Sequence, residues 1–263
     1  MHIHALICFG ARPGEGNPAL VVEGGDPSPE VRQRLAHERD TTCVFIDEDG
    51  DGGPVRVDYW YPHMRSPLCL HATLAVAAVL FRRTPDASAI TVETAMQGQR
   101  LVLLREGDDY FVRLAAQPAP QVDVTPEQAA ALLGAAPAAS LLAAPPRVAS
   151  VGSPKLLAEV RDAATLYALQ PDLAWIAAWS KQHGINGIYA WCRCKDDVYE
   201  GRNFNHLDPA LEDAATGVGA GALAAALGRS LVLYQGRAVG RDCLIRTRID
   251  GPALLVGGAA AFM

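Results

Sequence analysis

The sequence predicts an α+β protein made of two similar halves. Short, strand-like apolar segments bounded by Gly and Pro turns occur along most of the chain. Each half also contains one helix composed almost entirely of small apolar residues, at residues 71–81 and 215–227. A connector rich in Ala and Pro, residues 115–147, separates the two patterns. With 263 residues, the chain is long enough for two domains of about 100–150 residues each.

The first half is expected to contain two helices among its strands. Ser28 precedes Pro29 and Glu30, which is the pattern of a capped helix start with Pro at the first helical position. Residues 71–81 are apolar nearly all round, so this helix is expected to be buried. Short strands are expected at residues 2–9, 19–22, 42–46, 55–61, 90–93, 100–104 and 110–114.

The second half repeats the alternation after one helix in the connector. That helix starts at Thr125, where the run Thr-Pro-Glu-Gln has the pattern of a capping box. Further helices are expected at residues 155–160, at 172–183 before Gly184, and at 215–227. Strands are expected at residues 147–151, at 187–194 and after residue 227.

Composition and charge exclude several classes of function. The formal net charge is −6 and no basic cluster exceeds Arg82-Arg83, so no nucleic-acid partner is expected. The most apolar runs, such as residues 68–81, are shorter than the roughly 18–20 residues of a membrane span. The N-terminal residues lack the features of a signal peptide. The six cysteines are scattered, which is typical of reduced thiols and predicts a cytoplasmic protein.

The two small-residue helices share one further feature. Each opens with an Ala-Thr pair, Ala72-Thr73 in the first half and Ala215-Thr216 in the second. Helix N-termini carry free N–H groups and partial positive charge, so two such openings facing one cleft would suit a carboxylate. The alternative is that two Ala-rich helices look alike by chance.

Several segments, in order along almost the whole chain, resemble those of one family. Glu212-Asp213 followed by Ala-Ala-Thr-Gly resembles the E-D-x-A-T-G signature of the PhzF-like isomerases of phenazine biosynthesis. Residues 16–18 resemble that family's G-N-P segment, and residues 67–74 resemble its P-x-x-G-H-x-T-L turn. Residues 151–154 and 235–241 fit two later segments of the family.

This resemblance implies a fold shared with diaminopimelate epimerase. It implies two domains, residues 1–115 and 116–263, with the last strands able to cross back to the first domain. Each domain would be a mixed β-sheet wrapped around a central helix, with the active site in the cleft between them. Family members are typically homodimers that need no cofactor, and they isomerise small carboxylic acids by moving a proton.

The sequence also departs from the family pattern. Thr41 stands where the family has its acid/base glutamate, and Leu70 where it has the glycine before the histidine. Arg65 replaces an acidic residue, and Val218 replaces the serine or similar small residue after A-T-G. The resemblance therefore supports the fold more firmly than the reaction.

Three residues are candidates for catalysis. Cys69 occupies the place of a catalytic cysteine in the related diaminopimelate epimerases; a helix N-terminus and His71 would lower its pKa, although a free cysteine is often only a core residue. His71 could orient or protonate the substrate, or it could cap its own helix. Asp213 could be an acid/base or substrate partner, or an N-cap of the second helix.

Substrate-binding roles are expected for residues near the two helix starts: Asn17, Leu70, Thr73, Thr216, Gly217 and Val218. No metal site is expected, because the Cys192-x-Cys194 pair lacks a second close pair of ligands. The resemblance implies that no cofactor is needed, and a dinucleotide loop is not expected, because the glycines from Gly217 to Gly221 lack its sixth-position glycine and a preceding apolar strand.

Together these observations predict a cofactor-independent isomerase, that is an epimerase, a racemase or a proton-shifting enzyme. Its substrate would be a small amino or hydroxy carboxylic acid, and the chain would form a homodimer. Two alternatives remain open at this point. Cys69 could be the nucleophile of a hydrolase or transferase on the same fold, or the protein could bind a carboxylate without catalysis.

Overall fold

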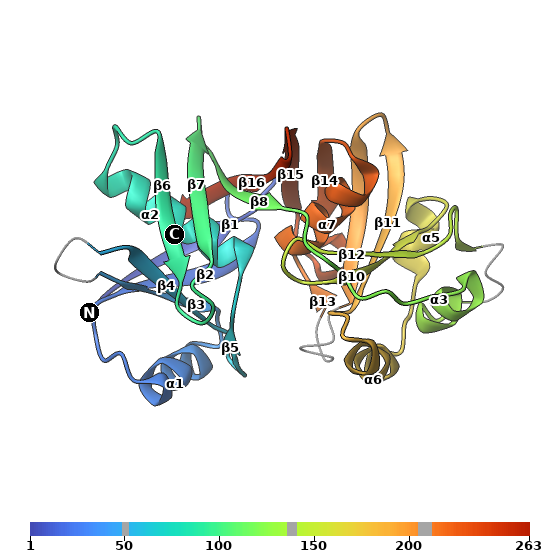
Figure 1. Ribbon diagram of the computed structural model, residues 1–263, viewed down its shortest axis with the longest axis horizontal. Helices are drawn as coiled ribbons and strands as arrows, with labels where there is room; N and C mark the ends of the chain where they lie inside the picture. The colour runs from blue at the N-terminus through green and yellow to red at the C-terminus, as the bar shows by residue number, and fades with distance from the viewer. Residues whose placement is uncertain (49–52, 136–140, 205–211) are drawn as a thin grey trace. The chain divides into compact units, whose positions relative to one another are not determined.

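The computed structural model describes residues 1–48, 53–135, 141–204 and 212–263 (Figure 1). The chain divides into two compact units. Unit 1 comprises Met1–Leu114 and Gly257–Met263, and unit 2 comprises Ala115–Val256. The last strand, β16 (Ala253–Phe262), therefore begins in unit 2 and ends in unit 1. Its end pairs with the first strand of the chain, with Leu6 opposite Phe262.

Unit 1 is a mixed sheet in the order β1-β2-β3-β4-β6-β7-β8, with β5 paired to β4. The pairs β2–β3 and β4–β6 are parallel, and the other neighbouring pairs in this order are antiparallel. The strands are β1 (His2–Cys8), β2 (Asn17–Glu23), β3 (Cys43–Asp47), β4 (Val55–Trp60), β5 (Arg65–Ser66), β6 (Ala89–Thr94), β7 (Arg100–Glu106) and β8 (Asp109–Ala115).

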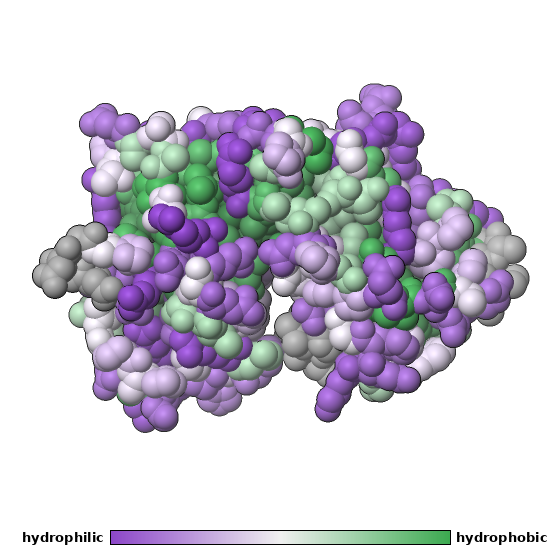
Figure 2. Space-filling view, in the orientation of Figure 1, coloured by the Kyte–Doolittle hydropathy of each residue, from purple (hydrophilic) through white to green (hydrophobic). Residues whose placement is uncertain are grey.

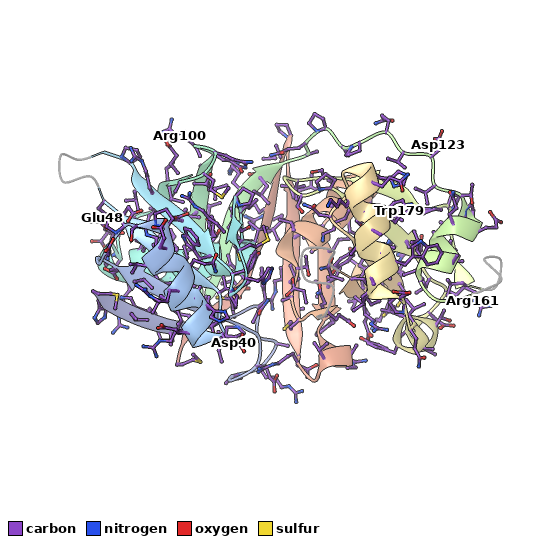
Figure 3. All side chains as sticks on the ribbon, turned by 90° about the horizontal axis from the view of Figure 1, so that it is seen from below. Asp40, Glu48, Arg100, Asp123, Arg161 and Trp179 are labelled. Carbon is purple, nitrogen blue, oxygen red and sulfur yellow. The ribbon has the colours of Figure 1, made fainter. Side chains whose placement is uncertain are left out.

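The centre of unit 1 is helix α2 (Leu70–Arg83), which buries every residue from Leu70 to Phe81. It contacts strands β1, β2, β3, β6 and β7, so the sheet wraps around it. The expected buried helix is thus confirmed. The other helix, α1 (Pro29–Arg39), begins with Pro29 after Ser28, as predicted, and ends at Asp40, which is labelled in Figure 3.

Unit 2 has a second mixed sheet, in the order β9-β10-β11-β12-β14-β15, with β13 paired to β12. The pairs β10–β11 and β12–β14 are parallel. The strands are β9 (Arg147–Ala149), β10 (Lys155–Glu159), β11 (Ile188–Lys195), β12 (Val198–Phe204), β13 (Glu212–Asp213), β14 (Leu231–Gln235) and β15 (Cys243–Asp250).

Helices cover both faces of this second sheet. The central helix α7 (Gly217–Leu227), orange in Figure 1, contacts β9, β10, β14 and β15. On the opposite face, α5 (Ala163–Ala168) and α6 (Leu173–His183) supply Leu166 and Ile176 to an apolar core with Leu156 and Phe204. Two further helices are α3 (Pro126–Leu132) and the 3₁₀ turn η1 (Arg237–Val239).

Local signals predicted two of these helices well. Thr125 forms a reciprocal capping box with Gln128 at the start of α3. The α6 helix, which carries the labelled Trp179 in Figure 3, is capped by Asp172 and ends at Gly184 with a positive φ of 66°.

The helix predicted at residues 155–160 is wrong, because this segment is strand β10. Its side chains alternate between the two faces of the sheet, and both faces are buried. A short apolar run of this kind cannot be distinguished from a buried helix by periodicity alone.

Polar and apolar residues are interspersed on the face of the molecule shown in Figure 2. No helix within the described ranges is long and apolar enough to cross a bilayer.

Candidate active site

Unit 1 places a thiol and an imidazole together at the start of its central helix. Cys69 is the N-cap of α2 and His71 lies in the first turn. The Sγ of Cys69 is 3.3 Å from Nδ1 of His71 and 3.8 Å from its Nε2. Both side chains are buried, with 3% of Cys69 and 7% of His71 exposed. The pair predicted from the sequence is therefore in hydrogen-bonding contact.

The surroundings of Cys69 favour the thiolate. Burial acts to raise the pKa of the Cys69 thiol, but the charge and hydrogen bond of His71 outweigh it and leave the pKa below its ordinary value. A hydrogen bond from the Tyr61 hydroxyl and the nearby N–H of Ala72 act in the same direction on this pKa. Such a thiolate can serve as a base or a nucleophile.

Other buried groups hold this thiol in place. The hydroxyl of Thr73 donates to the Cys69 carbonyl at 2.8 Å and also contacts the Tyr59 hydroxyl at 2.8 Å. Thr73 is fully buried, so its hydroxyl is occupied within the protein. Cys8 also lies near Cys69, and burial raises the pKa of Cys8 well above the usual range, with the Cys69 charge adding to the effect. Of the two thiols, only Cys69 is poised to ionise.

Two further predicted residues of unit 1 lie beside the pair. Asn17 begins β2 and is half-buried, and its Nδ2 is 3.5 Å from Nδ1 of His71. Leu70 is the first residue of α2 and is 3% exposed. We call Cys69, His71, Tyr61 and Asn17 the Cys69 cluster.

Unit 2 places Asp213 just before its own central helix. Asp213 lies on β13, paired with Asn203 of β12, and it is half-buried. Its Oδ2 accepts a hydrogen bond of 2.6 Å from the hydroxyl of Thr216, and its carbonyl accepts one of 2.7 Å from Gln235. Thr216, not Asp213, is the N-cap of α7. The interpretation of Asp213 as the N-cap is therefore wrong, and its carboxylate instead accepts a hydrogen bond from the N-cap residue.

The N-caps of the two central helices share one property. Neither Cys69 nor Thr216 makes a side-chain capping hydrogen bond to its helix. In α7, the N-cap side chain therefore does not occupy the first-turn N–H groups, which include those of Gly217 and the half-buried Val218. The two Ala-Thr pairs do not occupy equivalent helix positions, however. Thr216 is the N-cap of α7, whereas Thr73 lies inside the first turn of α2.

Close packing positions the start of α7. A side chain on Gly219 would come within 2.5 Å of the Tyr189 ring, so only glycine allows this approach of helix to sheet. The Tyr189 hydroxyl donates to Oε1 of Gln235 at 2.9 Å, and the same oxygen accepts from the Thr216 N–H at 3.2 Å. Gln235 thus links sheet, helix cap and Asp213 in one network.

Sequence reasoning did not identify a buried lysine in this network. Lys155, the first residue of β10, is 2% exposed, and its ammonium donates to the carbonyl of Asn186. Burial lowers the pKa of Lys155 to about 8, against an opposing attraction from Asp213. The signal available in the sequence was its position directly after the family-like segment 151–154. We call Asp213, Thr216, Gln235, Tyr189 and Lys155 the Asp213 cluster.

The departures from the family pattern have clear structural settings. Thr41 follows the left-handed Asp40 (φ 45°) at the end of α1, and its hydroxyl donates to the Arg39 carbonyl. It offers no ionisable group. Arg65 donates through Nε to Asp58 at 2.8 Å, and Asp58 is only 2% exposed. Arg65 is thus part of an internal ion pair.

The two cysteines of the C-x-C pair lie in different surroundings. Cys192 is buried and Cys194 exposed, with a β-bulge between Arg193 and Lys195. Burial raises the pKa of Cys192 to about 12. Across the described ranges, no three His, Cys, Asp or Glu side chains are grouped so that they could hold a metal ion.

Comparisons with known proteins agree with this architecture. A family model described as phenazine biosynthesis-like protein matches residues 7–263. An uncharacterized isomerase of Deinococcus radiodurans is 32% identical over 282 residues, covering 97% of this chain and 91% of that protein. The trans-2,3-dihydro-3-hydroxyanthranilate isomerase of Pseudomonas aeruginosa is 26% identical over 279 residues, covering 100% and 98%. The crystal structure of a PhzF-family protein from Bacillus anthracis has a TM-score of 0.82 at 19% identity, covering 100% and 98%.

Fold and relatives together define an isomerase with the diaminopimelate epimerase-like fold, in which each sheet wraps around a central helix. The chain belongs to the phenazine biosynthesis-like, or PhzF-like, family. The resemblance predicted from the sequence is confirmed.

Proposed function

We propose that this protein is a cofactor-independent epimerase, racemase or proton-shifting isomerase of a small amino or hydroxy carboxylic acid. The contact between Cys69 and His71 carries this proposal. It supplies a thiol with a lowered pKa, and therefore a base, at the start of a buried helix whose first N–H groups can bind an anion.

In the proposed reaction, the Cys69 thiolate removes the proton next to the substrate carboxylate. His71 stabilises the thiolate and holds it in position. The electron pair left on carbon spreads into the carboxylate or an adjacent unsaturated group. The N–H groups at the starts of α2 and α7 then stabilise the enolate-like charge, which is where this chemistry needs most help.

Proton return is assigned to the protonated form of Asp213 in unit 2, which regains its proton from solvent after each turnover. The proposal therefore requires Cys69 and Asp213 to act on one substrate molecule. Asp213 suits the role because Thr216 holds its side chain in place through a 2.6 Å hydrogen bond. A group on each side of one carbon is the requirement for inversion.

The loss of the family glutamate makes Cys69 the expected base. Thr41 cannot exchange a proton at neutral pH, while Cys69 can. The name of the Pseudomonas aeruginosa relative denotes an isomerase of a carboxylic acid, which agrees with a carboxylate substrate here.

The reaction is tested by incubation with panels of amino and hydroxy acids in deuterated water. Proton NMR should show loss of the signal from the carbon-bound hydrogen next to the carboxylate, or at the shifted double bond, for at least one compound. Chiral chromatography of the same samples separates inversion from proton shift. If compounds shown to bind by thermal shift exchange no hydrogen, the proposal is wrong.

A further inference from the structure

Polar side chains form a row on the α7-facing side of the sheet in unit 2. Tyr189 pairs with Asn203, and Asn203 with Asp213, so these three side chains share one face. Leu157 pairs with Tyr189, and Lys155 lies two residues before Leu157, which places Lys155 on the same face. The contact between Gly219 and the Tyr189 ring shows that this face is turned toward α7.

Apart from the half-buried Asp213, the row is closed to solvent. Lys155 is 2% exposed, and Tyr189 and Asn203 are fully buried. Both polar atoms of the Asn203 side chain lie without a hydrogen-bond partner in the described part of the chain. A buried ammonium in such surroundings is costly unless a negative charge compensates it.

In the part of the chain that the structure describes, the negative charge that acts on Lys155 belongs to Asp213. The α7 sequence contains no charged residue, and β11, β12 and β14 contribute the neutral Tyr189, Asn203 and Gln235 to this face. The nearest basic residue of β9, Arg147, is exposed and interacts with Glu159. Asp213 is the group whose attraction opposes the loss of the proton from Lys155.

We propose that Lys155 is a positioning residue for Asp213, and that its buried ammonium is the counter-charge that orients the Asp213 carboxyl group for proton transfer. Attraction between two opposite charges acts equally on both, so the Asp213 carboxylate and the Lys155 ammonium stabilise each other. The Lys155 ammonium is itself oriented by the Asn186 carbonyl, and the Asn186 side chain is oriented by a 2.7 Å hydrogen bond with Ser153. This inference rests on the proposed function only where it assigns Asp213 to proton transfer.

The coupling can be measured without any substrate. The chain contains only three lysines, Lys155, Lys181 and Lys195, so carbon-13 NMR of the labelled side chains gives three resolvable titrations. Lys155 is assigned by the loss of its signal in Lys155→Arg. In wild-type protein it should titrate near pH 8. In Asp213→Asn the Lys155 midpoint should fall by about 1 unit.

Glu159→Gln is the matched control, because Glu159 lies on the same strand, about 13 Å from Lys155 along it. It should move the Lys155 midpoint by less than about 0.2 unit, since Glu159 faces Arg147. An unchanged midpoint in Asp213→Asn, or equal shifts in both variants, would overturn the coupling.

Enzyme turnover provides the second readout. With the substrate identified by hydrogen exchange, Lys155→Met should lower kcat at least tenfold, and Lys155→Arg should restore most of it and remove any decline centred near pH 8. A coupling seen by NMR with no exchange of any bound acid would refute the proposed function alone. Full activity of Lys155→Met would refute the positioning role alone.

Discussion

The Sγ of Cys69 lies 3.3 Å from the Nδ1 of His71. Both residues lie at the start of α2, the buried central helix of unit 1. This contact reverses the usual effect of burial on a thiol. The buried Cys43 lacks such a partner, and its pKa is raised to about 11. The same fold thus contains one cysteine tuned to ionise and others that behave as core residues.

The first prediction concerns the reactivity of Cys69. Its pKa in the wild-type protein should lie below the ordinary value of about 8.5, and His71→Asn should raise it above that value, because burial is then opposed only by the hydrogen bonds from Tyr61 and Ala72. The rate of alkylation of Cys69 as a function of pH, followed by peptide mass spectrometry, measures both. A pKa for Cys69 that is the same with and without His71 would show that the contact is only packing.

The second prediction separates chemistry from stability at Asp213. Asp213→Asn retains an oxygen that can accept from Thr216 but cannot carry the proton. It should lower kcat by about 10²–10⁴-fold, while the free energy of unfolding falls by only about 1–2 kcal/mol, which corresponds to the one-unit fall expected in the Lys155 midpoint. Kinetics and urea denaturation on the same preparation give both quantities. Near-native turnover would remove Asp213 from the mechanism.

The third prediction concerns the ion pairs of Asp58 in unit 1. This carboxylate is 2% exposed and accepts from Arg32, Trp60 and Arg65, each at 2.8 Å. Asp58→Ala leaves the buried Arg32 without this partner and should cost about 3–5 kcal/mol of stability.

Asp47→Ala is the control for Asp58→Ala. Asp47 pairs with the same arginine, but its side chain is 40% exposed, so its loss should cost only about 1 kcal/mol. Urea denaturation of both variants measures the difference. Equal losses would contradict the importance of burial at Asp58.

The fourth prediction is a pH dependence of stability due to Lys155. Its pKa is about 8 in the folded protein, against about 10.4 in an unfolded chain. Between these values the unfolded state binds more protons, so this residue makes stability rise with pH. Relative to Lys155→Met, the wild-type protein should gain on the order of 3 kcal/mol from about pH 7 to about pH 10.5.

Lys181→Met provides the reference for this measurement, because Lys181 is exposed and should give no such slope. Urea midpoints across the pH range measure the difference between the two variants. A constant difference between wild type and Lys155→Met would mean that Lys155 is not buried as an ammonium.

Local sequence signals predicted those parts of the molecule that depend on near neighbours. Caps at Thr125 and Asp172 located two helices, and the spacing of Cys69 and His71 at a helix start predicted their contact. Each of these relationships joins residues at most three positions apart, within one helical turn, so the local sequence is enough to predict it.

Relationships set by sheet register were not predictable in this way. Lys155 faces the same side as Asp213 only because β10, β11, β12 and β13 pair in that register. Its segment was predicted as a helix, since an apolar strand buried on both faces has no alternation to identify it. Tyr59 and Tyr61 likewise reach the region of Cys69 through the fold and not through sequence proximity.

The central claim is that Cys69 is the base that removes the substrate proton, and hydrogen exchange tests it most directly. The exchange rate of the identified acid in deuterated water should fall at least about 10²-fold in Cys69→Ala. The rate should stay within about twofold of wild type in Cys43→Ala, which removes an equally buried thiol whose pKa is raised. Thermal unfolding of both variants shows that each is folded. A Cys69→Ala protein that exchanges hydrogen as fast as wild type would contradict the account.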